Sequence, residues 1–318
     1  MRAFTFVQAL LLVRTVWCAT TLEVGSGKTF TKIADAYAKA VEGDTIMVFP
    51  GTYNEKLTID KDNITMKGST FPSTDPTANK ATITAATYAK DVKNNDASAT
   101  LLVTGNNFAL YNINIANTAG TAGQAVALSV KGTECGFYAS SITGFQDTLY
   151  AHSGSSFYGS CYVEGGVDFV FGITGQAWLQ GCRVGVLKEK GTVTVTAQGR
   201  TSAGDKGEIV FDKAKITTGA GAASGAKGTN FLGRPLGNFS QTVFQNSDLG
   251  DVIAPEGWEV FKEGQDTSNV LAAEFKNTNG DGTRIGFASM LDAAVKIESI
   301  LPGYKKWVDM NFVGVSAP

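Results

Sequence analysis

The sequence predicts an all-β protein: a single-stranded, right-handed parallel β-helix, a solenoid of stacked strands, with a short N-terminal capping helix. One observation is a repeated pattern of a bulky residue, four mostly small or polar residues, a further residue and a nearby glycine. Its copies begin at Phe137, Phe157, Trp178, Phe211 and Phe244, and the intervals between the last three are longer than the first two. A period of about twenty residues, with loops inserted in the later turns, is typical of a solenoid.

The composition agrees with many short strands joined by tight corners. The chain has 37 glycines and only 7 prolines, and Val, Thr and Ile recur in short runs such as TVTVT at 192–196. A solenoid grows by adding coils and needs no second core, so residues 20–318 are expected to form one domain. A helix is expected at Ile33–Ala40, where it would cover the open strand edge at the end of the stack.

The N-terminus has the pattern of a targeting segment. Residues 1–19 resemble a secretory signal peptide, with a basic start and an apolar middle that Arg14 interrupts. Cleavage after Cys18 or Thr20 fits as well as cleavage after Ala19, and the alternative is an apolar strand or helix of the fold itself. We therefore expect a secreted, extracellular protein. No other apolar run approaches the length of a membrane span, so no membrane partner is expected.

The charge balance argues against one class of partner. The chain carries 27 Lys and Arg against 29 Asp and Glu, and removal of residues 1–19 would take away Arg2 and Arg14 and leave a net charge near −4. A protein that binds nucleic acid would be built with a basic balance. No nucleic-acid partner is therefore expected.

Two aspartates lie among apolar and aromatic neighbours, Asp147 in QDTLY and Asp168 in VDFVF. Asp147, Asp168 and Arg234 each precede a copy of the repeat by the same interval, so all three are expected in one column of the solenoid. With parallel strands stacked at ~4.8 Å, the aspartates lie one rung apart and Arg234 lies two rungs beyond Asp168. That distance is within reach of a guanidinium side chain, and we expect the group to line a semi-buried cleft.

Two glutamines extend this group. Gln124 lies about one coil before Asp147, one rung to the other side, and Gln146 is the immediate neighbour of Asp147. Gln146 joins the cleft if the strand ends or bends there. Each residue taken alone also has a structural reading: the aspartates as turn caps, Gln124 as part of a polar ladder and Arg234 as a surface charge.

Six short blocks resemble, in order, the signature blocks of pectin methylesterases. The match covers nearly all of the chain after residue 20, and six blocks in order are far more specific than one. The resemblance implies a β-helix that hydrolyses galacturonate methyl esters in pectin (methylated homogalacturonan), as a monomer and without a cofactor. The blocks are GTYNE (51–55), GQAVAL (123–128), GFQDTLY (144–150), GVDFVFG (166–172), LGRP (232–235) and PEGW (255–258).

The resemblance also implies a role for each site residue. Asp168, held as a carboxylate by Arg234, is the nucleophile that attacks the ester carbonyl. Asp147 is the acid that protonates the departing methanol and then the base that activates water. The side-chain amides of Gln124 and Gln146 donate hydrogen bonds to the oxyanion.

Substrate contacts are implied along the same groove. Phe171 matches a cleft aromatic of the family, and Tyr150 and Val167 are candidates beside it. Aromatic residues of a solenoid also pack in the core, so sugar stacking and core packing are weighted equally for Tyr150 and Phe171. The family motif LGRPW has Leu236 here in place of tryptophan, and Trp258, about one coil further, is expected to supply part of the missing wall.

Three cysteines remain after residue 19. Cys161 and Cys182 lie one coil apart in the repeat, so we expect a disulfide between neighbouring rungs, with a ladder of buried free thiols as the alternative. With no CxxC motif and a single histidine, the sequence predicts no metal site. No GxSxG elbow accompanies His152, so a structural or surface role is expected for it rather than that of a triad base.

Two NxS/T sequons, at Asn63 and Asn238, are candidate glycosylation sites in a secreted chain. Asn238 lies shortly after Arg234, where a glycan would crowd the groove. Asn63 is therefore expected to be modified more readily than Asn238.

Two other functions stay open on the sequence alone. A polysaccharide-cleaving β-helix enzyme would also use carboxylates around a groove, but it would shorten the polymer. A non-catalytic pectin-binding protein, or one with an altered substrate, is the other, because a fold does not dictate a function and Leu236 departs from the family motif. Release of methanol without loss of chain length separates an esterase from both.

Overall fold

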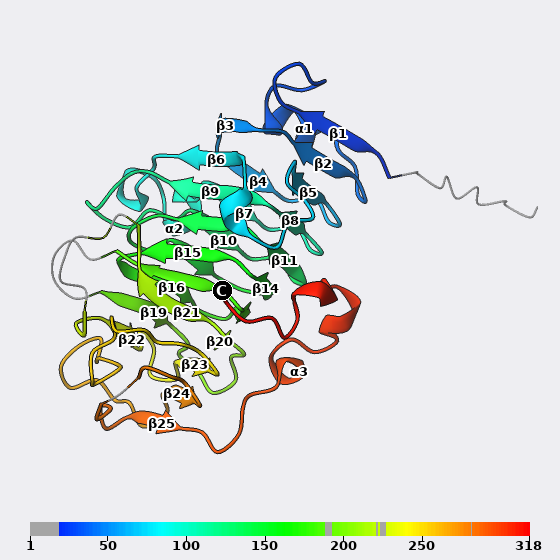
Figure 1. Ribbon diagram of the computed structural model, residues 1–318. Coiled ribbons are helices and arrows are strands. Elements are labelled where there is room, and N and C mark those ends of the chain that lie inside the picture. Colours follow the sequence, from blue (N-terminus) through cyan, green and yellow to red (C-terminus); the bar gives the residue numbers. More distant parts are fainter. Residues whose placement is uncertain (1–18, 188–192, 221, 223–226, 281) are drawn as a thin grey trace, which may run out of the picture.

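The chain winds into a parallel β-helix (Figure 1). The computed structural model describes residues 19–187, 193–220, 222, 227–280 and 282–318. A representative coil runs through β14 (Ser155–Gly159), β15 (Tyr162–Gly165) and β16 (Val167–Gly172), and each of these strands pairs in parallel with its counterpart in the next coil. The predicted solenoid is thus confirmed, and residues 1–19, the expected signal peptide, lie outside the described residues apart from Ala19.

Each coil passes through three sheets, which we call the long, middle and groove sheets in the order in which β14, β15 and β16 pass through them. The long sheet contains β1 (Thr21–Val24), β2 (Thr45–Val48), β5 (Thr65–Gly68), β8 (Ala109–Tyr111), β11 (Cys135–Tyr138), β14, β17 (Gln176–Gln180), β20 (Glu208–Asp212), β23 (Gln241–Gln245), β24 (Leu271–Phe275) and β25 (Ala288–Met290). The middle sheet contains β3 (Gly51–Asn54), β6 (Ala81–Ala85), β9 (Ile113–Asn117), β12 (Ser141–Thr143), β15, β18 (Arg183–Val186) and β21 (Lys215–Thr218). The groove sheet contains β4 (Leu57–Ile59), β7 (Leu101–Val103), β10 (Leu128–Val130), β13 (Leu149–Ala151), β16, β19 (Thr194–Gln198) and β22 (Phe231–Gly233).

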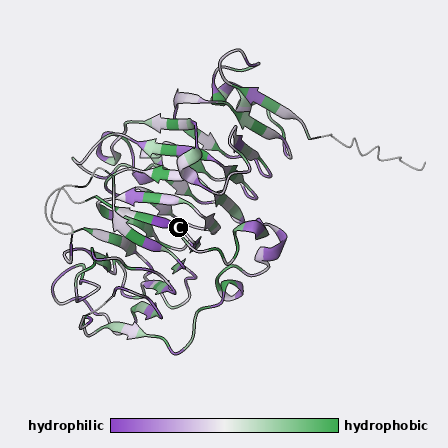
Figure 2. Ribbon diagram, in the orientation of Figure 1, coloured by the Kyte–Doolittle hydropathy of each residue, from purple (hydrophilic) through white to green (hydrophobic). Residues whose placement is uncertain are grey.

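The core lies between these sheets and is filled by one inward-facing column from each strand. Apolar residues accordingly occur in the strands at every level of the stack (Figure 2). Along β9, for example, the burial alternates strictly between buried and half-buried positions, as expected when successive side chains point to opposite faces. Packing of this kind, repeated from coil to coil, buries apolar area that no single coil could bury alone.

The strand register of the long sheet differs from the alignment that the sequence repeat predicted. Phe137 of β11 pairs with Tyr158 of β14, and their rings stack in the core at 5.1 Å. Phe157 pairs with Trp178, but both lie on the outer face of the sheet. The sequence pattern aligned Phe137 with Phe157, but Phe137 belongs to the inward-facing column and Phe157 to the outward-facing one. A shift of one position along a strand moves a side chain to the opposite face of the sheet.

The first end of the stack is covered by α1 (Ile33–Lys39), which confirms the predicted capping helix. Its Ile33 and Ala36 are buried, and it packs against β1 and β2. Glu55 accepts hydrogen bonds from the backbone N–H groups of Ile33 and Ala34, at 2.9 and 2.8 Å, and so satisfies donors that the first turn leaves unpaired.

A C-terminal strap, residues 291–316, crosses the outer face of the long sheet (Figure 1). Gln176 of β17 donates to the carbonyl of Ile300 at 2.6 Å, and Gln245 of β23 exchanges two hydrogen bonds with the backbone of Val295. The strap contains α3 (Ile297–Ile300), η3 (Tyr304–Lys306) and η4 (Met310–Phe312), and the remaining short helices are α2 (Asn95–Ser98), η1 (Pro76–Ala78) and η2 (Ala89–Asp91). Among the described residues, no helix is long and apolar enough to cross a membrane.

The predicted disulfide is wrong, because Cys161 and Cys182 are buried free thiols, as is Cys135. Cys161 donates to the carbonyl of Phe137 at 3.4 Å, and Cys182 donates to that of Tyr158 at 3.4 Å. In neighbouring parallel rungs the two side chains point the same way, and the two thiols interact without a covalent bond between them. The alternative, a ladder of small apolar groups, is what the structure contains.

Candidate active site

Two aspartates sit side by side on the groove sheet. The bridge between Gln146 and Val167 places Asp147, just before β13, next to Asp168 in β16. Both have left-handed backbone conformations, with φ of 63° and 49°, and both are buried, at 3% and 7% exposure. Such conformations are uncommon outside glycine and concentrate at functional sites.

A bulge in β16 sets the direction of Asp168. Val167 pairs with Thr194 and Val170 pairs with Thr196, so β16 has one residue more than β19 between the two pairs. The hydroxyl of Thr194 donates to Oδ1 of Asp168 at 2.7 Å and accepts from its backbone N–H at 3.2 Å. The extra residue thus turns this carboxylate out of the strand ladder, and Thr194 holds it there.

Arg234 binds Asp168 with two parallel hydrogen bonds. Its Nε and Nη2 atoms donate to Oδ1 and Oδ2 of the carboxylate, each at 2.8 Å. A bidentate guanidinium of this kind is among the strongest partners of a carboxylate. Arg234 follows β22, which is two strands beyond β16, as predicted. Its column differs from the expected one, because Gly233 pairs with Thr196 and Arg234 is therefore in line with Phe171. Its side chain reaches back from there to Asp168.

Asp147 lies in a different electrostatic environment. Burial and then the charge of Asp168 raise the pKa of Asp147 to about 7. No arginine pairs with it among the described residues; its Oδ2 accepts a hydrogen bond from Nδ2 of Asn95 at 2.8 Å. Below pH 7 this carboxyl therefore carries a proton next to an ionised neighbour.

Asn95 is a site residue that the sequence did not reveal. It opens the short helix α2, whose N-cap is the Asn94 side chain, which accepts from the N–H of Ala97. This helix lies in the segment between β6 and β7, far from the groove motifs in sequence. Only the coiling of the chain brings it beside Asp147, so neither the period nor a motif could have identified it.

Gln124 and Gln146 lie on the two neighbouring rungs that the sequence predicted. Gln124 and Gln146 form an isolated parallel bridge, and Gln146 forms another with Val167, so the chain runs through three neighbouring coils in register. Gln146 lies outside the regular strands, where β13 has not yet begun. Both side chains line the cleft that contains the two aspartates.

The cleft has a volume of about 500 Å³ and is walled by aromatic and aliphatic groups. The rings of Tyr150 and Phe171 stack at 4.0 Å with planes only 9° apart, on the outward face of the groove sheet rather than in the central core. Leu236 is 36% exposed and lines the same cleft. Phe261, 42% exposed, places its ring 5.1 Å from the guanidinium carbon of Arg234 and also lines it.

One predicted substrate contact is wrong. Trp258 is only 2% exposed; its ring packs edge-on against Phe244 in the core, and its Nε1 donates to Oε1 of Glu274 at 3.2 Å. Its rung is as expected, because it pairs with Gly233, but the alternation of side chains points it inward. Phe261, three residues later, takes the place expected for it. Val167 is half-buried next to Asp168, and its contact with the substrate stays a prediction.

His152 stands beside the aromatic wall and has a partner of its own. Its ring stacks on Tyr150 at 4.4 Å, and its Nδ1 lies 3.1 Å from Oδ1 of Asp96. Burial alone would raise the pKa of Asp96, but hydrogen bonds from His152, Ser129 and Lys131 outweigh it and lower the pKa to about 2. The ring of His152 therefore packs against Tyr150, and in the described part of the chain its side-chain partner is an aspartate rather than a serine nucleophile.

Among the described residues, no group of three His, Cys, Asp or Glu side chains is placed to hold a metal ion.

The glycosylation sequons differ in accessibility. The amide of Asn63 donates to Glu42 and the residue is half-buried, with a left-handed backbone. Asn238 is exposed, on the segment that also carries Arg234 and Leu236. The expected preference for Asn63 therefore rests on crowding of the groove alone and stays a prediction.

A long parallel β-helix with an open groove, a pair of carboxyls and a sugar-sized aromatic wall defines the class of carbohydrate-active β-helix enzymes. The Pectinesterase family model matches residues 19–290. The chain belongs to the pectinesterase family, and it is accordingly an enzyme, a carboxylic ester hydrolase.

Fungal proteins share the sequence over most of its length. A pectinesterase of Aspergillus niger is 35% identical over 297 residues, which cover 91% of this chain and 89% of the relative. A pectinesterase of Aspergillus aculeatus is 34% identical over 299 residues, with 90% of each chain covered.

Solved structures share the fold. The pectin methylesterase from Aspergillus niger, in a form with an N-acetylglucosamine stub, superposes with a TM-score of 0.86 at 32% identity, covering 94% of this chain and 99% of that one. The pectin methylesterase from carrot has a TM-score of 0.82 at 28% identity, covering 91% and 94%. The parallel β-helix is therefore shared with both.

Proposed function

We propose that this enzyme hydrolyses the methyl esters of galacturonate units in pectin and releases methanol and de-esterified polymer. The observation that carries the proposal is the contrast between two adjacent carboxyls. Asp168 receives two hydrogen bonds from Arg234, whereas Asp147 has no arginine and a pKa raised to about 7 by burial and by the charge of Asp168. Carboxyl pairs whose environments differ in this way divide the roles of nucleophile and acid between them.

The first half-reaction begins at Asp168. Its carboxylate attacks the ester carbonyl at C6 of the sugar, and the negative charge moves to the carbonyl oxygen. The side-chain amides of Gln124 and Gln146, which line the same cleft, donate hydrogen bonds to this oxyanion. Collapse of the intermediate breaks the bond to methoxide, which takes the proton of Asp147 and leaves as methanol.

The second half-reaction restores the enzyme. Asp147, now a carboxylate, takes a proton from water, which attacks the acyl–enzyme anhydride at the sugar carbonyl. The bond to Asp168 breaks, the product carboxylate is released, and both aspartates return to their starting states. Arg234 stays bound to Asp168 as the charge on that carboxylate disappears and returns, so it needs no reorganisation.

The substrate lies along the groove sheet in this proposal. Tyr150, Phe171, Leu236 and Phe261 supply the apolar faces that a galacturonate ring and its methyl ester require. The groove is open at the surface, which suits an internal unit of a polymer. We further propose a secreted monomer, for which N-terminal sequencing and light scattering of protein from the culture medium are the measurements.

One experiment separates this function from its rivals. The full-length protein is incubated with highly methylated pectin, and methanol and polymer length are measured together. We expect methanol to accumulate while the polymer length stays constant. Shortening of the polymer would identify a glycosidic-bond-cleaving enzyme instead, and binding without either product would identify a pectin-binding protein.

A further inference from the structure

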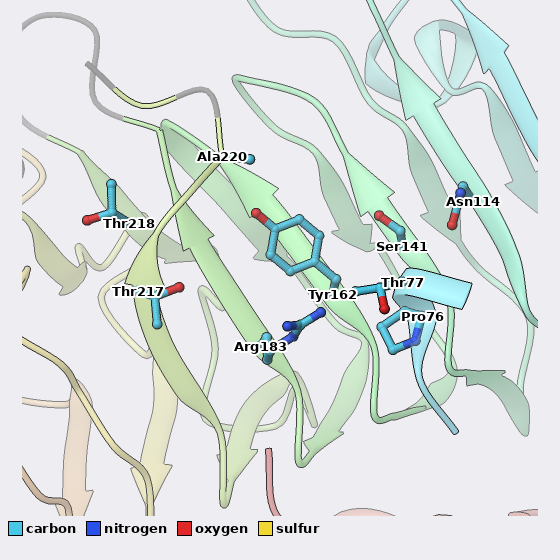
Figure 3. Close-up of a pocket in the computed structure, with 9 residues that line it drawn as sticks. All are labelled: Pro76, Thr77, Asn114, Ser141, Tyr162, Arg183, Thr217, Thr218 and Ala220. Carbon is cyan, nitrogen blue, oxygen red and sulfur yellow. The ribbon is translucent and has the colours of Figure 1, made fainter. Parts of the chain in front are cut away.

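A second hollow lies on the middle sheet, a different face of the solenoid from the groove sheet (Figure 3). Its volume is about 480 Å³. We call it the Tyr162 pocket, and its floor is formed by Asn114, Ser141, Tyr162, Arg183, Thr217 and Thr218, which come from five neighbouring strands. The pocket shares no lining residue with the proposed active site.

The ring of Tyr162 lies flat across the next strand. A Cβ atom on Gly185 of β18 would lie 2.3 Å from the Tyr162 hydroxyl and 2.9 Å from its Cζ, so the ring occupies the space that any other residue at 185 would need. The hydroxyl donates to Glu164, which also accepts from the N–H of Ala220 at 3.1 Å. One face of the ring thus rests on backbone, and the other faces the pocket (Figure 3).

Arg183 lies beside this ring, with its guanidinium carbon 5.7 Å from the ring centroid of Tyr162. Its charge helps to lower the pKa of Asp75, but among the described residues that carboxylate hydrogen-bonds to the hydroxyl and N–H of Thr77 and forms no direct ion pair with Arg183. Glu164, the other acid at the margin, accepts from Tyr162 and Ala220. A half-buried guanidinium is therefore available to a ligand.

The elements of the pocket match one kind of ligand. A flat aromatic face suits the apolar face of a pyranose ring, and hydroxyl side chains suit its hydroxyl groups. A guanidinium that has no bidentate partner in the protein suits a carboxylate. The methyl ester of the unreacted substrate is neutral and would gain little from an arginine. The product of the proposed reaction carries the carboxylate.

We propose that the Tyr162 pocket binds a galacturonate unit of de-esterified pectin, with the sugar on the ring of Tyr162 and its carboxylate on Arg183. This inference rests on the proposed function, which supplies a polymer that bears both esters and carboxylates. Because the pocket and the groove lie on different faces, one long polymer, or two neighbouring polymers, occupies both. Binding at the pocket holds the enzyme on material already de-esterified and raises the effective concentration of the remaining esters at the groove.

Isothermal titration calorimetry with a short unesterified oligogalacturonate tests the pocket without any need for turnover. The full-length protein is compared with Arg183→Gln and Tyr162→Ala, and with Lys32→Ala, which removes one exposed positive charge at the capping helix. We expect both pocket variants to lose one binding event, or to weaken it at least roughly tenfold, as loss of a charge-assisted hydrogen bond does. The Lys32→Ala protein should bind as the unaltered protein does, and a fully methylated oligomer should show no loss in Arg183→Gln.

Superimposable titrations of Arg183→Gln, Tyr162→Ala and the unaltered protein would overturn the proposal. Methanol release from a short methylated oligomer is measured in parallel, and the pocket variants should match the unaltered protein there while showing a raised KM on partly de-esterified polymer. If the unaltered protein released no methanol from any ester, the proposed function would fail. The calorimetric result would still decide whether the pocket binds the acidic sugar.

Discussion

The long sheet and the groove sheet are built from the same coils, yet they differ in regularity. In the long sheet, β14 and β17 pair through five consecutive residues, as do β17 and β20. At the same level of the groove sheet, β13 and β16 pair through three residues, β16 and β19 pair around a bulge, and isolated bridges replace strands. In the long sheet, continuous strand pairing keeps the side chains packed in the core. In the groove sheet, interruptions of the pairing leave backbone and side chains available to face a ligand.

Each sheet therefore predicts a different kind of mutational effect. Substitutions in the long sheet should change the free energy of unfolding and leave the chemistry of the folded protein alone. Substitutions at the interruptions of the groove sheet should act chiefly on catalysis, although Asp147, whose pKa is raised by burial, should also affect how stability depends on pH. Seven substitutions in five experiments test this division, from the largest expected effect to the smallest.

Asp168→Asn tests the groove sheet most severely. The side chain keeps nearly the same shape and its contact with Thr194, but it loses the negative charge that attacks the ester. We expect kcat to fall by at least ~10⁴-fold, as for other nucleophile replacements. Methanol release and circular dichroism are measured on the same sample; more than a few per cent of the activity in a folded protein contradicts the assignment.

Phe244→Ala tests the long sheet. The ring is fully buried, stacks on Phe211 at 4.4 Å and meets Trp258 edge-on. Removing it leaves a cavity and should lower the free energy of unfolding by ~3–5 kcal/mol, measured by denaturant titration, with kcat of the folded protein unchanged. A large loss of kcat at full stability would mean that the two sheets do not divide stability and function in this way.

Gln124→Ala and Gln146→Ala test the bridge that joins neighbouring coils at the groove. Their hydrogen bonds strengthen only as charge develops on the ester oxygen, so each change should lower kcat by roughly 10²–10³-fold while KM changes little. Steady-state kinetics on methylated pectin give both parameters. A change confined to KM would make the glutamines ground-state contacts.

The raised pKa of Asp147 predicts a pH dependence of stability, to which Glu208 of the long sheet, with a pKa raised to about 6 by burial, also contributes. The unfolded aspartate loses its proton near the ordinary aspartate pKa of 3.8, whereas the folded one keeps it until about pH 7. Between these values the folded state binds more protons, so stability falls as pH rises, by at most ~4 kcal/mol for three pKa units and by less after relaxation.

Thermal melts between pH 4 and pH 8 measure this slope. Asp147→Asn should flatten it and should be the more stable protein at pH 7, although its kcat is severely reduced for want of an acid. The activity of the unaltered protein should decline as pH rises through about 7, because the acid form of Asp147 is then lost. An equal slope in both proteins would show that another group titrates.

Leu236→Trp is the mildest of the five. The leucine is 36% exposed at the edge of the cleft, where an indole would extend the flat apolar wall that Phe261 already begins. We expect KM on polymeric pectin to fall roughly threefold, less than about 1 kcal/mol, with kcat nearly unchanged. Phe261→Ala is the matched opposite and should raise KM; an unchanged KM in both would place the sugar elsewhere.

Prediction from the sequence succeeded where a residue's position depends on counting along the coil. The solenoid, the capping helix, the adjacency of Asp147 and Asp168, and the rung of Gln124 all follow from a period and from the spacing of parallel strands. The separation of two rungs between Asp168 and Arg234 follows in the same way. The period is strong because each coil must repeat its inward apolar positions to build the core.

Prediction failed where a residue's position depends on which face a side chain takes or on an inserted segment. Trp258 is on the expected rung but points inward, and Arg234 lies out of the expected column, in line with Phe171 instead of Asp168. A shift of one residue reverses the face, and spacing alone does not report it. Asn95 comes from an insertion with no motif, and the cysteine pair has the spacing of a disulfide but consists of two free thiols.

The C-terminal strap has a consequence for how the molecule unfolds. A solenoid held only by contacts between neighbouring coils opens one coil at a time, because each coil depends on the next alone. The strap binds β11 through the hydroxyl of Tyr138, β17 through Gln180 and β23 through Gln245. Coils that are distant along the stack thereby share one partner, and loss of any one of them loosens the others, so the strap makes a linear array behave as a cooperative unit.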